Sequence, residues 1–201
     1  MNGWWCVLLT LVCGACRDNP THPAPDRAAE SAVYSAVLAA QVVAGDTTVP
    51  VLVRRSLVRP IAESETRRDG EARAALLKRL VAFGVPRDLA NTLLDAPAGP
   101  FDTSLVARAP LAVTMEPLVP GSQADSADRR RYIQAIAPPH EPTARYRWVG
   151  LSRIAFSEDG TQAAVYVEMS CGWTCGSFAV YVLRRQAGQW VISDVLTLAV
   201  A

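Results

Sequence analysis

The pair Cys171 and Cys175 is the sharpest chemical motif in the sequence. Three residues separate the two cysteines in the string Cys-Gly-Trp-Thr-Cys. Thiol oxidoreductases place two residues between their cysteines, at a helix N-terminus that lowers the thiolate pKa. Strand-like sequence flanks the pair here, and the glycine is typical of a turn. The spacing therefore favours a structural disulfide over a redox-active dithiol, and Trp173 is a candidate contact residue at the loop tip.

The sequence lacks the usual residues of metal and hydrolase sites. The histidines are His22, in a proline-rich stretch, and His140. A zinc site at the two cysteines would need two further ligands, so we predict neither a metal nor a cofactor. The sequence contains no G-x-S-x-G elbow and no G-x-x-x-x-G-K-[ST] phosphate loop.

Glu168 is the carboxylate that stands out, because it lies in a strand-like run that is otherwise apolar. We expect its side chain on an exposed sheet face, or paired with Arg153 or Arg184. Scattered acidic residues leave a carboxylate-based hydrolase open as an alternative, but no catalytic residue is predicted.

Composition argues for a globular domain and against nucleic-acid binding. Half of the 201 residues are hydrophobic, 19% are charged, and the net charge is +1. A nearly neutral chain has no electrostatic attraction for a polyanion, and aromatic residues at 7% give few stacking platforms.

The first fifteen residues are typical of a secretion signal. The apolar run at 4–15 is shorter than the about 20 residues that a spanning helix needs, and it ends in small residues. A polar stretch with three prolines follows at 17–25. Such a stretch forms neither helix nor sheet, and we interpret 16–26 as an extended tether.

The string Cys-Gly-Ala-Cys at 13–16 resembles the lipobox of bacterial lipoproteins. In that motif small residues precede a cysteine that becomes lipidated and N-terminal, which implies lipidation of Cys16. Cys13 stands where the motif usually has leucine, and no lysine or arginine precedes the apolar run. The expected location is the cell envelope, with a lipid anchor in the membrane, or the secreted fraction if Cys16 is not lipidated.

The lipoprotein assignment accounts for an odd number of cysteines. Of the five, Cys6 and Cys13 would leave with the leader and Cys16 would be blocked by lipid. Cys171 and Cys175 would then remain as a pair in an oxidising compartment, where a disulfide is expected. Because the closed loop is short, the entropic stabilisation is only about 2 kcal/mol.

Helical spacing dominates the first half of the chain. Asp26 can cap a helix over 27–43. Residues 49–58 indicate a strand, and polar residues at 63–70 indicate a loop. A second helix is expected from four apolar residues at helical spacing, Ala72, Leu76, Leu80 and Phe83, with Gly84 as its C-terminal cap.

Three further elements are expected between this helix and the C-terminal part. Pro86 begins a short helix that carries Leu89 and Leu93. Residues 111–115 indicate a short strand, and 125–136 a further helix.

Four β runs close the chain, at 149–156, 162–169, 178–184 and 190–200. Short connections, two of them with glycine, require antiparallel neighbours. Alternation places Val165 and Val167 on one face of the sheet and Tyr166 and Glu168 on the other. Both faces are largely apolar, so we expect the helices of the first half to cover one of them. The predicted fold is α+β, a single domain over 27–201 with N-terminal helices packed on a four-stranded antiparallel meander.

This C-terminal part resembles a family of uncharacterised bacterial secreted proteins and lipoproteins. The matching residues are Leu-Ser-Arg-Ile at 151–154, Phe-Ser at 156–157, Asp-Gly at 159–160, Ala-Val-Tyr-Val at 164–167, Cys-Gly at 171–172 and 175–176, and Gly-Gln-Trp at 188–190. The resemblance implies the fold and the compartment but no mechanism.

The sequence thus predicts an envelope lipoprotein that acts as an interaction or structural module for an unidentified envelope protein or ligand. The alternative is a secreted enzyme, either a carboxylate hydrolase or a redox protein that uses Cys171 and Cys175.

Overall fold

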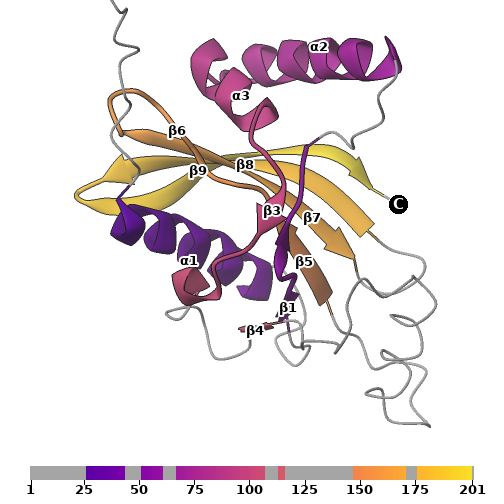
Figure 1. Cartoon of the computed structure of the whole chain (residues 1–201). Helices are drawn as coiled ribbons and strands as arrows, with labels where there is room; N and C mark the ends of the chain where they lie inside the picture. Colours follow the sequence, from indigo (N-terminus) through magenta and orange to yellow (C-terminus); the bar gives the residue numbers. More distant parts are fainter. Residues whose placement is uncertain are drawn as a thin grey trace, which may run out of the picture.

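A computed structural model describes residues 26–43, 51–60, 67–106, 113–115, 147–170 and 176–200 of the chain (Figure 1). The helices among them are α1 (Arg27–Val43), α2 (Arg67–Ala82), α3 (Arg87–Leu94) and the short 3-10 helix η1 (Thr103–Val106). The strands are β1 (Val51–Val53), β2 (Ser56–Leu57), β3 (Gly99–Pro100), β4 (Val113–Met115), β5 (Arg147–Leu151), β6 (Ala155–Phe156), β7 (Gln162–Ser170), β8 (Gly176–Gln186) and β9 (Gln189–Val200).

The α+β class and the C-terminal antiparallel meander are confirmed. Strands β5, β7, β8 and β9 are antiparallel neighbours in chain order, and β6 adds a short pairing to β7. The first predicted run, 149–156, is divided into β5 and β6. The predicted helix at 125–136 lies outside the described residues.

The sheet continues beyond the meander through two strands that lie within the predicted strands at 49–58 and 111–115, but their parallel pairing was not predicted. Strand β1 pairs in parallel with β5 on one side and with β4 on the other, so that the strand order is β4-β1-β5-β7-β8-β9. The sheet is therefore mixed. The three-residue strands β1 and β4 are too short for their pairing partners to be inferred from periodicity.

Helices cover both faces of the sheet rather than one, which corrects the expectation from the sequence. Helix α1 lies against one face, while α2 and α3 lie against the other (Figure 1). Two apolar cores result. Val165 belongs to the core under α1, and its neighbour Ala164 to the core under α3.

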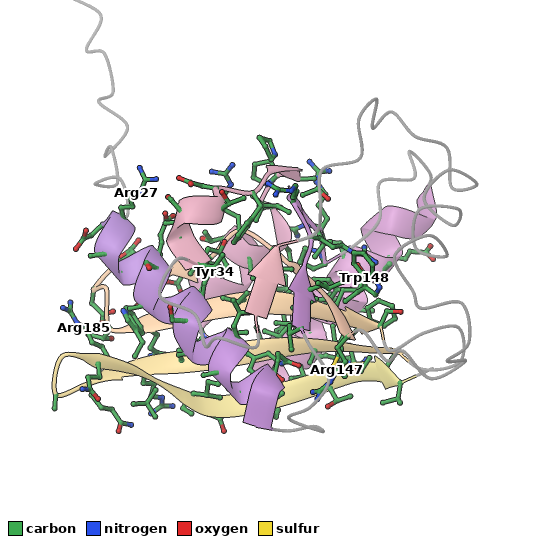
Figure 2. All side chains as sticks on the ribbon, turned by 90° about the horizontal axis from the view of Figure 1, so that it is seen from below. Arg27, Tyr34, Arg147, Trp148 and Arg185 are labelled. Carbon is green, nitrogen blue, oxygen red and sulfur yellow. The ribbon has the colours of Figure 1, made fainter. Side chains whose placement is uncertain are left out.

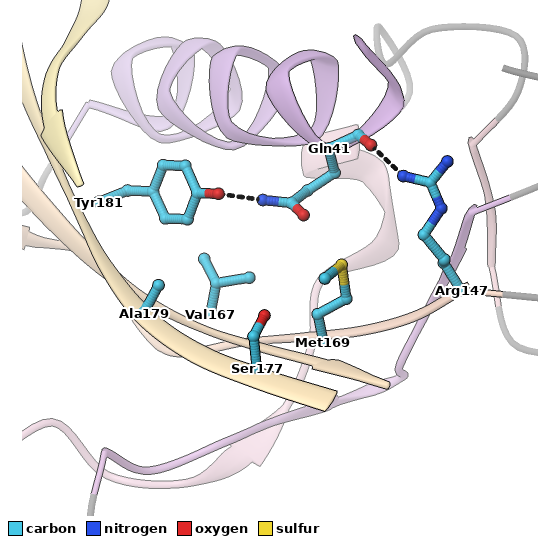
Figure 3. Close-up of a pocket in the computed structure, with 7 residues that line it drawn as sticks. All are labelled: Gln41, Arg147, Val167, Met169, Ser177, Ala179 and Tyr181. Atoms are coloured by element: carbon cyan, nitrogen blue, oxygen red, sulfur yellow. Dashed lines mark hydrogen bonds between the residues drawn. The ribbon is translucent and has the colours of Figure 1, made fainter. Parts of the chain in front are cut away.

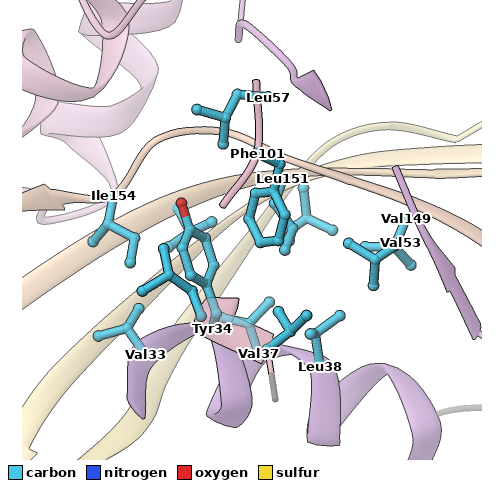
Figure 4. Packing of buried hydrophobic residues seen from close by; sticks show 14 of the residues in the cluster. Val33, Tyr34, Val37, Leu38, Val53, Leu57, Phe101, Val149, Leu151 and Ile154 are labelled. Atoms are coloured by element: carbon cyan, nitrogen blue, oxygen red, sulfur yellow. The ribbon is translucent and has the colours of Figure 1, made fainter. Parts of the chain in front are cut away.

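Helix α1 forms where its apolar stripe predicts. Val33, Val37 and Leu38 are fully buried against the sheet (Figure 4). The side chain of Asp26 accepts a hydrogen bond from the Ala28 amide at 3.0 Å, as expected of an N-terminal cap. Tyr34 extends from the same stripe, and its ring meets that of Phe101 edge to face at 5.2 Å.

The connection between α2 and α3 follows the predicted cap. Gly84 has a φ of 97°, a left-handed conformation that favours glycine. Leu80 and Leu89 are fully buried, whereas Phe83, the last residue of the predicted apolar face, follows the end of α2 and is 39% exposed. The predicted loop at 63–70 is wrong from Arg67 onward, because α2 begins there. Burial of the helix against the sheet outweighs the polar character of its first turn.

The predicted strand at 49–58 is broken after β1. The amides of Arg54 and Val58 still donate to β5, to the carbonyls of Val149 and Leu151 at 2.9 Å each. Between them the chain turns outward, and β2 pairs with β3 instead. The predicted strand at 49–58 thus contributes to two sheets, because tertiary pairing determines where strands begin and end more strongly than β propensity does.

Strand β9 is the last strand on one side of the sheet. Two bulges interrupt its pairing with β8, one between Phe178 and Ala179 and one between Val182 and Leu183. The guanidinium of Arg79, on α2, donates to the β9 carbonyls of Thr197 and Leu198 at 3.3 and 3.4 Å. This contact links α2 to the end of the strand.

Gly150 marks the closest approach between β5 and the 54–58 segment. A Cβ atom at Gly150 would lie 2.7 Å from Cγ1 of Val58 and 3.4 Å from Cδ of Arg54. We predict that Gly150→Ala destabilises the fold by about 1–3 kcal/mol, as expected of overpacking. Gly70→Ala is the matched control, since nothing lies within 4 Å of its Cβ position in α2.

The control should stabilise the protein by up to about 1 kcal/mol, because alanine is the better helix former. Urea unfolding of both variants measures the two effects. Equal midpoints for Gly150→Ala and the unsubstituted protein would contradict the close packing of Val58 on β5.

Candidate functional site

A cavity of about 120 Å³ lies between the last turns of α1 and strands β7 and β8 (Figure 3). Its apolar wall is formed by side chains of the sheet, Val167, Met169 and Ala179. Its polar wall is formed by Gln41 of α1, Arg147 of β5, and Ser177 and Tyr181 of β8. Elements from both ends of the chain therefore build one site.

Arg147 fixes the end of α1 over the sheet. It is the first residue of β5, it is 8% exposed, and its guanidinium donates to the Gln41 carbonyl at 2.6 Å. The last turn of α1 contains no basic residue of its own. A cation from the sheet thus binds one of the carbonyls that a helix end leaves unpaired, where the helix dipole also favours positive charge. Figure 2 shows Arg147 near the last turn of α1 and Arg27 at its first turn.

The second polar contact of the cavity orients the hydroxyl group of Tyr181. Nε2 of Gln41 donates to the Tyr181 hydroxyl at 2.5 Å, and Gln41 is 4% exposed. A phenol that accepts a hydrogen bond still carries its own hydrogen. Tyr181 can therefore donate this hydrogen to a bound group. Among the described lining residues Arg147 alone carries a charge.

The opposite face of the sheet carries an ion pair centred on Glu168. Arg54 donates to its carboxylate at 3.1 Å, and the two side chains are 23% and 26% exposed. The expectation that Glu168 is exposed or paired with Arg153 or Arg184 is therefore wrong. Arg54 reaches Glu168 across Gly150, its register partner on β5, where the missing side chain leaves room.

Tyr166 lies beside this ion pair. Burial raises the pKa of Tyr166 to about 12, and the negative charge of Glu168 acts in the same direction. The phenol is therefore neutral at physiological pH. Because the Glu168 carboxylate is bound to Arg54, the local chemistry of this face is that of a structural ion pair.

Ser152 is a buried polar residue within the first predicted β run, 149–156. It is fully buried in the break between β5 and β6. Its amide donates to the Tyr166 carbonyl, and its Oγ accepts from the Tyr166 amide, both at 2.9 Å. Tyr34 donates to the Ser152 carbonyl at 2.9 Å. Ser152 thus continues the hydrogen bonding of β7 where the neighbouring strand is interrupted.

The residues with predicted chemistry, Cys16, Cys171, Trp173 and Cys175, lie outside the described residues, as do both histidines. The described neighbours of the cysteine pair are strand ends, with Ser170 of β7 paired to Gly176 of β8. Met169 and Ser177, one residue further in, line the cavity. Along the chain, the cysteine pair thus lies within a few residues of the cavity. Among the described residues, no group of three or more His, Cys, Asp or Glu side chains could hold a metal ion.

Comparisons with protein-family models, with curated proteins and with solved structures find no match.

The cavity residues had only a weak signal in the sequence. Gln41 interrupts the apolar C-terminal half of the predicted first helix, and Tyr181 shares a strand face with small residues. The contact between them spans 140 positions, beyond what local periodicity can indicate.

We predict that Ser152→Ala destabilises the fold by about 1–3 kcal/mol, because the buried Tyr166 amide loses its acceptor. Ser193→Ala is the matched control. Its hydroxyl donates to the Val182 carbonyl at 3.2 Å from a half-buried position, so its loss should cost less than about 1 kcal/mol. Thermal and urea unfolding give both values, and equal losses for the two variants would contradict the role assigned to Ser152.

Proposed function

We propose that this chain is a bacterial envelope lipoprotein whose domain acts by binding another molecule rather than by catalysing a reaction. The observation that supports this function best is the cavity between α1 and strands β7 and β8. Its volume of about 120 Å³ compares with about 300–1,000 Å³ for pockets that enclose drug-sized ligands. An engineered cavity of about 150 Å³ binds benzene. A cavity of this size suits one small group, such as a single side chain of a partner.

The side chains that line the cavity also favour binding over catalysis. Arg147 is its one charged residue among those described, and it is engaged with the end of α1. The described residues that line the cavity include no His, Asp, Glu, Lys or Cys side chain that could act as a general acid or base. The groups that line the cavity are suited to hydrogen bonding and apolar contact.

The proposed lipid anchor fits the start of the domain. Helix α1 begins at Arg27, directly after the proline-rich stretch, and Asp26 caps it. A tether that ends at this cap would hold the domain in water while acyl chains on Cys16 enter the membrane. No described helix is long and apolar enough to cross a bilayer.

The proposed disulfide fits the strand register. Ser170 and Gly176, the described residues that precede Cys171 and follow Cys175 in the chain, pair directly with each other. Bridged cysteines need Cα atoms about 4.4–6.8 Å apart. A bond between them would close the hairpin next to the cavity residues Met169 and Ser177.

We predict two modifications of the mature chain purified from membranes. Its intact mass should correspond to a chain that begins at an acylated Cys16 and lacks two hydrogens because Cys171 and Cys175 are bonded. Salt washing should leave it on the membrane, since more than one acyl chain anchors it stably, and detergent should release it. An intact leader or an unmodified Cys16 would overturn the anchor, and free thiols at both other positions would overturn the disulfide.

We predict that a partner contacts the protein at the cavity. A photo-crosslinking residue at Val200, which pairs with Ser177 and is 76% exposed, should give a discrete product in native envelopes. Ala179→Leu, which fills the cavity, should abolish the product. Ala199→Leu is the matched control, because it adds the same atoms at an exposed position on the opposite face of β9.

Glu168→Gln distinguishes the binding module from a carboxylate enzyme. The binding proposal predicts an unchanged cross-link in this variant, because Glu168 lies on the other face of the sheet. A product that survives Ala179→Leu, or the lack of any product, would contradict the proposal. Melting temperatures verify that each variant is folded.

A further inference from the structure

We propose that the cavity between α1 and strands β7 and β8 binds a neutral carboxamide carried on a short apolar stem. This inference rests on the proposed binding function and names the chemistry of the group that the cavity accepts. The observation that carries it is the side-chain carbonyl oxygen of Gln41, which has no hydrogen-bond partner among the described residues.

The side chain of Gln41 is held in one orientation over the cavity. Its nitrogen donates to the Tyr181 hydroxyl at 2.5 Å, and its backbone carbonyl accepts from Arg147 at 2.6 Å. Gln41 is 4% exposed. Figure 3 shows the side-chain oxygen turned away from Tyr181 and toward the sheet residues that line the cavity. The carbonyl oxygen of a buried residue therefore faces the cavity.

This oxygen lacks the hydrogen bond that a buried carbonyl normally has. No described residue donates to it. Buried polar atoms are paired with protein or ordered water in the large majority of cases, because an unmade hydrogen bond costs free energy. A group that occupies the cavity can supply the missing donor. A ligand N–H fits this need, whereas a carboxylate has acceptors only and would leave the Gln41 oxygen unpaired.

The contact between Gln41 and Tyr181 also leaves donors beside this acceptor. A primary amide has two N–H hydrogens, and the Gln41 nitrogen uses one of them for Tyr181. The Tyr181 hydroxyl accepts that bond and keeps its own hydrogen. A carboxamide carries a donor and an acceptor side by side in one plane, so it can bind the Gln41 oxygen and one of these donors together. An ammonium group has no acceptor and meets only the first need.

The sheet wall of the cavity suits a short apolar stem. Val167 and Ala179 are 2% and 8% exposed, and Met169 lines the same wall. The volume of about 120 Å³ is smaller than that of an engineered cavity of about 150 Å³ that binds benzene. It therefore admits a carboxamide with a few carbon atoms but no large body. The ligand needs no charge, because the guanidinium of Arg147 is engaged with the end of α1.

Two sources can present this group, the glutamine or asparagine side chain of a partner polypeptide or a free small amide. Both offer the same planar amide and the same short apolar stem. The experiment therefore contains one series of probes for each source.

Titrations followed by the methyl NMR signals of Val167, Met169 and Ala179 test the inference. The sample is the mature chain, expressed without its leader and with Cys16→Ser. Propionamide should shift these signals with at least about tenfold higher affinity than propionate or butanone, because both of these lack the N–H that the Gln41 oxygen needs. Ala179→Leu fills the cavity and should abolish the shifts.

The second series uses a five-residue peptide with glutamine at its centre and the same peptide with methionine there. Both peptides have the same backbone amides, so a difference between them reports on the side chain. Tighter binding of the glutamine peptide identifies a polypeptide side chain as the ligand. Binding of propionamide without a preference between the peptides supports the inference with a free small amide as ligand.

Gln41→Met removes the side-chain amide but keeps the length of the side chain and the backbone carbonyl that binds Arg147. It should weaken propionamide binding by at least about tenfold. Gln189→Met is the matched control, because it makes the same change at an exposed position at the start of β9 and should leave the affinity unchanged. Melting temperatures verify that both variants are folded, and the comparison of probes on the unsubstituted protein needs neither variant.

Equal affinity for propionamide and propionate, or no shift with any probe, would overturn the inference. A preference for propionate would also overturn it, because the nitrogen of Gln41 rather than its oxygen would then face the cavity. The cross-link at Val200 reports on the binding function separately. If Ala179→Leu abolishes that cross-link while Gln41→Met retains it and propionamide does not bind, the binding module stands and only the ligand chemistry is wrong.

Discussion

Burial of strand β7 on both faces is the constraint on which the rest of the structure depends. Residues 163–167 of this strand are buried without interruption. Because successive side chains of a strand point to opposite faces, Val165 needs an apolar cover on one side and Ala164 on the other. Helix α1 supplies the first cover, and α2 and α3 supply the second. The strand pairs on its two edges with β5 and β8, so it lies in the interior in every direction.

The break between β5 and β6 shows how this burial is maintained where the sheet is irregular. A buried backbone amide without a partner costs about as much as a lost hydrogen bond. At Tyr166 the partner is the Ser152 side chain rather than a strand neighbour. The same serine ties the sheet to α1 through Tyr34. The polar contacts of the interior are few, and they lie where regular pairing ends.

The sequence predicts the elements with local signals and not the contacts between distant ones. The limits of α1 agree with the sequence because a capping Asp26 and an apolar stripe define them, and the meander agrees because its connections are short. The second covered face, the parallel pairing of β1 with β5, and the Arg54–Glu168 ion pair were missed. Each depends on contacts between residues far apart in the chain. The ion pair can form because Gly150 has no side chain between Arg54 and Glu168. In the cavity, the contact between Gln41 and Tyr181 could not be predicted, because it depends on where α1 ends over the sheet. Arg147, from a third element, fixes that position.

The contact between Arg79 and the end of β9 bears on how the protein avoids self-assembly. An outermost strand offers its free amides and carbonyls as a template on which another chain can add, and long flat strands are the most prone to do so. Strand β9 has 12 residues, but two bulges twist it and interrupt its regular spacing. Arg79 places a charged group over two of its carbonyls. An incoming strand would have to displace that charge and match an irregular register, so this edge discourages fibrous growth.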